Sequence, residues 1–82
     1  MNTTALRIND VIRAQPFWKP GLAIDQRPAP KTKKRPAGLM VRLNQWTDDT
    51  WNACAVALIA AGFEVERVPA PTKRGERFLV VL

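Results

Sequence analysis

A repeated motif, Pro-Ala-Pro followed by a Thr-Lys-Arg cluster, constrains the fold of this chain more than any other feature. It occurs first at residues 28–35 (PAPKTKKR) and again at residues 69–74 (PAPTKR). An alternating apolar segment precedes and follows each copy, which is typical of the two strands of a β-hairpin. A helical apolar pattern precedes each hairpin in turn. The sequence therefore predicts one helix-hairpin unit that occurs twice.

The first unit begins with an amphipathic helix. Thr3 or Thr4 is a suitable N-cap, and Pro16 ends the pattern because proline cannot continue a helix. The apolar positions expected on one side are Ala5, Leu6, Ile8, Val11 and Ile12. Residues 16–21 (PFWKPG) then form a rigid connection, in which Trp18 either packs on the core or stands exposed as a contact residue.

Two strands complete the first unit. Residues 22–25 and 39–44 each alternate apolar and polar side chains, the pattern of a half-buried strand. The second strand directs Leu39, Val41 and Leu43 to one face. Between the strands, residues 27–37 are expected to form a basic, proline-rich loop, with disorder of that loop as the alternative.

The helix of the second unit has clearer boundaries. Thr47 or Asp48 caps its start, and Gly62 stands where a left-handed residue usually ends a helix. No charged residue lies between Thr50 and Phe63, so this helix should be covered on more than one side. Either the first helix or the equivalent helix of a second chain could cover it. A homodimer is thus one of two alternatives.

The second hairpin has a first strand around residues 63–66 and a second around residues 78–82. In the latter, Leu79 and Val81 stand between the apolar residues Phe78, Val80 and Leu82. Because this strand is apolar on both faces, it is either a central strand or part of an exposed apolar patch.

Together these patterns predict a single domain over residues 1–82 with an α+β fold. The expected order is α-β-β-α-β-β, giving a four-stranded, mostly antiparallel sheet with two helices packed on it and a possible pseudo-two-fold internal repeat. A different reading treats residues 16–37 as a disordered basic arm and leaves a β-α-β-β fold. The two differ over whether residues 22–25 form a strand.

The net charge of +6 is concentrated in the first half of the chain. Residues 1–38 contain eight basic and two acidic residues, whereas residues 39–82 contain five of each. The first repeat therefore carries the stronger positive charge, and the second repeat lies in a formally neutral half.

The composition argues against an enzyme. There is no histidine, and the single cysteine, Cys54, lies in an apolar helix as a small hydrophobic residue. The acids are explained by their places in helix and strand, so neither a metal nor another cofactor is expected. The four glycines occur singly and form no phosphate loop. The absence of a membrane span and of a disulfide pair favours a cytoplasmic protein.

The candidate contact residues are therefore basic, with one aromatic side chain added. They are Arg27, Lys31, Lys33, Lys34, Arg35, Arg42, Lys73, Arg74, Arg77 and Trp18. Prolines stiffen both loops, so the cations should be held away from the sheet. The first hypothesis is a non-catalytic protein that binds the phosphate backbone of DNA or RNA. The alternative is a small inhibitor or modulator, of the kind carried by phages and plasmids, that binds an acidic surface of a host nucleic-acid-handling machine.

Overall fold

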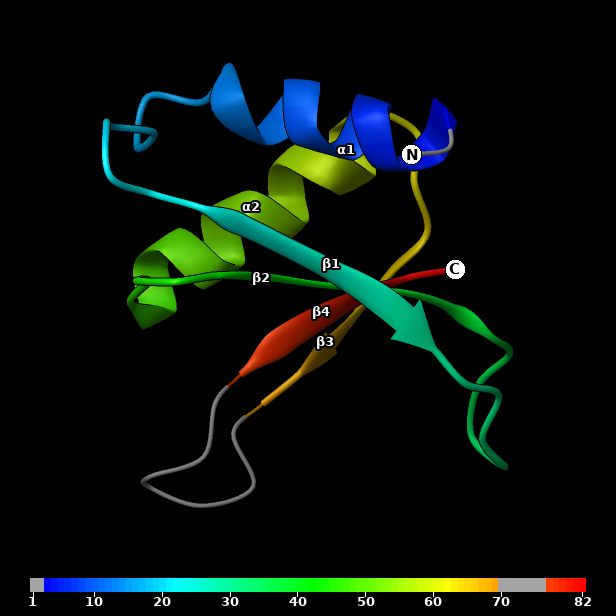
Figure 1. Cartoon of the computed structure of the whole chain (residues 1–82). Helices are drawn as coiled ribbons and strands as arrows, with labels where there is room; N and C mark the ends of the chain where they lie inside the picture. The colour runs from blue at the N-terminus through cyan, green and yellow to red at the C-terminus, as the bar shows by residue number, and fades with distance from the viewer. Residues whose placement is uncertain (1–2, 70–76) are drawn as a thin grey trace.

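The computed structural model describes residues 3–69 and 77–82 of the chain and confirms the predicted α+β fold (Figure 1). Its elements are α1 (Thr3–Arg13), β1 (Ile24–Ala29), β2 (Gly38–Leu43), α2 (Asp48–Ala60), β3 (Val65–Val68) and β4 (Phe78–Val81). Both helices lie on one side of the sheet, and their buried side chains join those of the strands in one core. The order α-β-β-α-β-β is the one that the repeated motif indicates.

The sheet has the strand order β1-β2-β4-β3, and every neighbouring pair is antiparallel. Each helix-hairpin unit contributes one edge strand and one central strand. The central strands β2 and β4 run in opposite directions, as a two-fold axis between them would require. Because of this topology, the end of β3 and the start of β4 lie at the opposite end of the sheet from the β1–β2 connection.

The core lies between the helices and the inner face of the sheet. Its buried members are Ile8, Ile12, Val41, Leu43, Cys54, Ala55, Leu58, Leu79 and Val81. Val41 stands opposite Leu79 in the register of β2 and β4, so Leu79 shares the helix-facing side of the sheet. Of the two alternatives for this strand, the structure shows a central strand. Leu79 and Val81 do not form an exposed patch.

The first hairpin differs from the sequence prediction at its boundaries. Residues Arg27, Pro28 and Ala29 were expected in the loop, but they pair with Met40, Leu39 and Gly38 in the sheet. The loop is thus confined to residues 30–37. Of the strand predicted at 22–25, residues 24 and 25 lie in β1 and residues 22 and 23 precede it, and the reading of residues 16–37 as a disordered arm is wrong. Proline is tolerated in β1 because β1 is an edge strand.

The ends of α2 follow the sequence prediction. Thr47 is the N-cap, and its side chain accepts a hydrogen bond from the backbone N–H of Thr50, whose own hydroxyl accepts one from the N–H of Thr47. Gly62 has φ of +98°, which a residue with a side chain rarely adopts. The N-terminal helix departs in two respects. Thr3 and Thr4, the expected N-caps, both lie inside α1, and Leu6 is half exposed although it was expected on the buried side.

α1 and α2 contact each other on one flank, so α1 provides part of the cover that the apolar sequence of α2 requires. The opposite face of α2 remains open, with Val56 58% and Ile59 46% exposed. Within the described residues, no helix is long and apolar enough to cross a membrane.

Candidate functional site

The tip of the β1–β2 hairpin presents three lysines to solvent. Lys31, Lys33 and Lys34 are exposed, and none of them forms an ion pair with an acid of the described residues. Thr32 fixes the backbone beneath them: its N–H donates to the Arg35 carbonyl at 2.9 Å, and its hydroxyl accepts from the N–H groups of Lys34 and Arg35 at 3.2 Å each. The turn therefore holds the backbone of the tip in one conformation while the three ammonium groups stay hydrated.

Arg35 does not extend into solvent with the lysines, contrary to the expectation that the loop cations are held away from the sheet. Its side chain is only 18% exposed, and its Nη1 lies 3.7 Å from a carboxylate oxygen of Glu66 in β3. Its Nε is buried without a hydrogen-bond partner among the described groups. β3 is the edge strand farthest from β1, so this contact brings the Arg35 end of the loop over the outer face of the sheet. The side chain of Val80, on the same face, is completely buried.

Two further predicted contact residues share one acid on that outer face. Asp25 stands opposite Arg42 in the register of β1 and β2, and its Oδ2 lies 3.0 Å from Arg42 Nε and 3.3 Å from Arg27 Nε. Arg27 is the more exposed of the two arginines, with 64% of its side chain accessible. The carboxylate of Asp25 partly neutralises both, which reduces the positive potential of the face beside the tip.

Of the cations predicted in the second basic loop, the structure describes Arg77. Arg77 forms an ion pair with Asp48 at the start of α2, and its guanidinium lies 5.9 Å from the centre of the Trp51 ring. These contacts tie the start of β4 to α2. Lys73 and Arg74 lie outside the described residues. Of the eight predicted contact residues that the structure describes, those of the first hairpin are the ones it brings together.

Trp18 is half-buried and packs against the core. Its outer side faces Arg13, whose guanidinium carbon lies 5.9 Å from the ring centre. Of the two roles considered for this residue, packing is the one that the structure shows.

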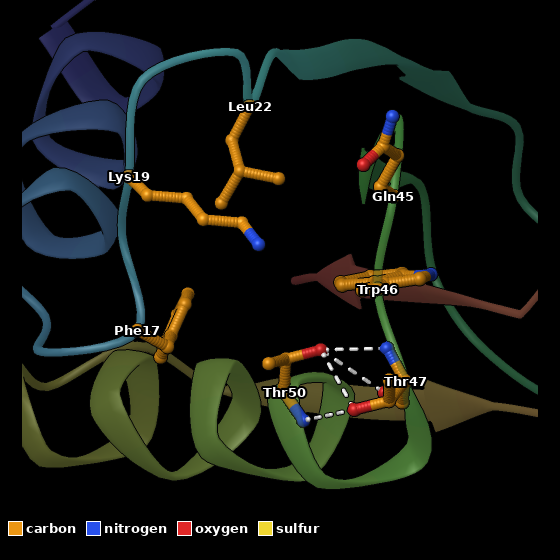
Figure 2. A pocket seen from close by; sticks show the side chains of 7 residues that line it. All are labelled: Phe17, Lys19, Leu22, Gln45, Trp46, Thr47 and Thr50. Carbon is orange, nitrogen blue, oxygen red and sulfur yellow. Dashed lines mark hydrogen bonds between the residues drawn. The ribbon is translucent and has the colours of Figure 1, made fainter.

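A pocket at the other end of the first hairpin was not predicted (Figure 2). It has a volume of about 400 Å³ and lies between the connection from α1 to β1 and the connection from β2 to α2. Its lining residues are Phe17, Lys19, Leu22, Gln45, Trp46, Thr47 and Thr50. Phe17 precedes the β1–β2 hairpin in the sequence and Trp46 follows it. This pair of aromatic residues was the signal in the sequence that could have indicated the pocket.

The described residues contain no arrangement typical of nucleophilic or metal-dependent catalysis. Cys54 is completely buried, and burial raises the pKa of its thiol to about 12, so the thiol stays protonated at neutral pH. Among the described residues, no three His, Cys, Asp or Glu side chains lie close enough to hold a metal ion.

Comparison with known proteins gave no match to a family model, a curated protein or a solved structure. The function must therefore be argued from the geometry of the chain itself.

Proposed function

We propose that this protein binds the phosphate backbone of nucleic acid through the tip of the β1–β2 hairpin and catalyses no reaction. The observation that supports this most is the contrast within the predicted cation set. Arg27, Arg35 and Arg42 contact acids, whereas Lys31, Lys33 and Lys34 project from an ordered turn with no such partner among the described residues. Exposed ammonium groups on a fixed backbone suit phosphates, which they meet without having to break an internal ion pair.

The three lysines of the tip also set the expected salt dependence. Each phosphate that a cation neutralises in duplex DNA contributes about −0.9 to the slope of log affinity against log salt. Three contacts predict a slope of about −2.7, and about −2.1 on a single strand, where each contributes about −0.7. Binding of this kind is weak, little dependent on base sequence, and lost as salt rises.

A salt titration with a variant pair tests the proposal. Lys33→Gln/Lys34→Gln should remove two phosphate contacts and weaken binding to every sequence alike. The slope on duplex DNA should change from about −2.7 to the shallower value of about −1. Arg13→Gln/Arg67→Gln removes the same charge from exposed positions away from the tip and should leave the slope unchanged. Equal behaviour of the two double variants would show that only net charge matters and would contradict a contact at the tip.

A second candidate function, binding to a protein, is favoured by the open face of α2. Val56 and Ile59 are exposed side by side on a helix whose only charged residues are Asp48 and Asp49 at its start. Exposed apolar surface of this kind is typical of interfaces. A second copy of this chain, or a host nucleic-acid-handling protein that the chain inhibits or modulates, would cover it.

Two measurements on Val56→Gln/Ile59→Gln test this second candidate. Light scattering of the wild-type chain should show a dimer that the variant loses, or a nuclease-treated bacterial lysate should yield a partner that the wild type retains and the variant does not. A cytoplasmic setting is part of both candidate functions, because nucleic acid and its machinery are found there. A wild-type chain that is monomeric and retains no protein would exclude this candidate.

A further inference from the structure

The pocket beside the start of α2 has the composition of a ligand site. Its volume of about 400 Å³ lies within the range of small-molecule sites, about 300–1,000 Å³. Phe17, Leu22 and Trp46 supply apolar walls, while Gln45, Thr47 and Thr50 supply amide and hydroxyl groups. A few polar groups among apolar walls are the usual means by which a pocket orients a ligand.

Among the described residues that line the pocket, Lys19 alone is ionic. Figure 2 shows its Nζ pointing into the space between Leu22, Phe17 and Trp46. It forms no ion pair within the described residues. The positive end of the α2 dipole lies at the same place, because Thr47 is the N-cap of that helix, but the carboxylates of Asp48 and Asp49 in the first turn offset it. The ammonium group of Lys19 is therefore the feature that favours an anionic group here.

Phe17 and Trp46 are held in place by the core without being covered by it. Both are half-buried and pack against the core cluster, and both also line the pocket. The core therefore already restricts the motion of each ring. A planar group that packs against the exposed part of the ring costs little additional side-chain entropy.

We propose that this pocket binds one unstacked nucleotide, with the base against Trp46 and Phe17 and the phosphate on Lys19. A nucleotide combines the two properties that the lining selects, a planar face for aromatic side chains and an anion for a lone ammonium group. The inference rests on the proposed function, since it names a nucleotide as the ligand. It adds a site separate from the tip, because the six residues of β1 span about 20 Å between them.

Nucleotide fragments distinguish this proposal from general anion binding. In NMR titrations, adenosine 5′-monophosphate should shift the indole N–H signal of Trp46, which a Trp46→Phe spectrum identifies. The Trp51 signal serves as an internal control, because its indole N–H donates to the Phe78 carbonyl away from the pocket lining. Adenosine and ribose 5-phosphate each lack one half of the ligand and should bind at least about tenfold more weakly. Equal shifts from ribose 5-phosphate, or no shift from the nucleotide at millimolar concentration, would overturn the proposal.

Matched charge variants test the role of Lys19 in this site. Lys19→Gln should weaken binding of the nucleotide about tenfold, whereas Arg67→Gln, which removes one positive charge from an exposed position of β3 outside both sites, should not affect it. Equal effects of the two variants would refute the role of Lys19. Conversely, duplex binding should depend on the tip lysines and not on Lys19. The proposal for either site can therefore be refuted while the other stands. Tighter binding of a short single strand than of the free nucleotide would identify the natural ligand as a strand; equal affinity would identify it as a free nucleotide.

Discussion

Gly38 at the start of β2 is the position where a single methyl group should damage this fold most directly. A Cβ at this residue would lie 2.3 Å from the carbonyl oxygen of Val81 and 3.1 Å from its carbonyl carbon. Carbon–oxygen contacts between neighbouring strands are normally about 3.3–3.6 Å. The backbones of the central strands β2 and β4 would have to separate by about 1 Å, since no flexible side chain is available to move aside.

The sign of the stability change for Gly38→Ala decides whether this reasoning holds. At a strand position with free space, replacing glycine by alanine stabilises a protein by about 0.5–1 kcal/mol. Overpacking costs about 1–3 kcal/mol, and the upper part of that range applies because backbone meets backbone. The expected net loss is about 2 kcal/mol, from a total of about 4–12 kcal/mol for a chain of this length.

Urea denaturation followed by circular dichroism measures this change. With an m-value of about 1 kcal/mol per M, the midpoint for Gly38→Ala should fall by about 2 M. Gly21→Ala is the control, because a Cβ there meets nothing within 4 Å and only the φ of +96° opposes it. Hydrogen exchange should accelerate in the β2–β4 ladder of the Gly38 variant alone. A midpoint equal to or above that of the wild type would refute the close approach of the two strands.

Two further predictions concern single side chains. Asp25→Asn removes the carboxylate that Arg27 and Arg42 contact, so the slope of log affinity for duplex DNA against log salt should steepen by about 1. The free energy of unfolding should change by less than about 1 kcal/mol, because both ion pairs are partly exposed. An unchanged slope in a salt titration would count against this prediction. The second prediction follows from the pKa of Cys54, about 12 in the folded protein against 9.0 for the free thiol. Above pH 9 the unfolded chain loses the thiol proton while the folded chain keeps it. The free energy of unfolding should therefore fall between pH 9 and 12, by about 1.4 kcal/mol per pH unit at most. In denaturation curves over this pH range, Cys54→Ala should abolish the part of the decrease that the thiol causes.

The sequence was sufficient for the element order because its signals are local. The N-cap at Thr47, the left-handed Gly62 and the alternation in β2 each depend on residues within one element. The extent of β1 was missed because Pro28 resembles a loop residue, and only its place in an edge strand makes it compatible with pairing. Likewise, Phe78–Leu82 is apolar at every position, so alternation could not select its inner face; the pairing of Leu79 with Val41 does.

The candidate site was predicted only as a region of positive charge, because the state of each cation depends on contacts between distant residues. Arg35 pairs with Glu66, Arg42 with Asp25 and Arg77 with Asp48, at separations of 17 to 31 residues in the chain. No count of charges along the sequence distinguishes these arginines from the lysines between them. The fold pairs these arginines with acids of other elements, whereas Lys31, Lys33 and Lys34 form no ion pair within the described residues.

The strand order directs the two hairpins toward opposite ends of the sheet. β2 and β4 are antiparallel neighbours, so the end of β4 at Val81 lies beside Gly38 and the first hairpin loop, while its start at Phe78 lies at the other end of the sheet beside the end of β3. A repeat of helix and hairpin about a two-fold axis separates its loops in this way by construction. In the proposed function, Lys31, Lys33 and Lys34 at the tip of the first hairpin contact phosphate. The pocket proposed for a nucleotide, with Lys19 and Trp46, lies at the opposite end of that hairpin, so both proposed sites belong to the first helix-hairpin unit.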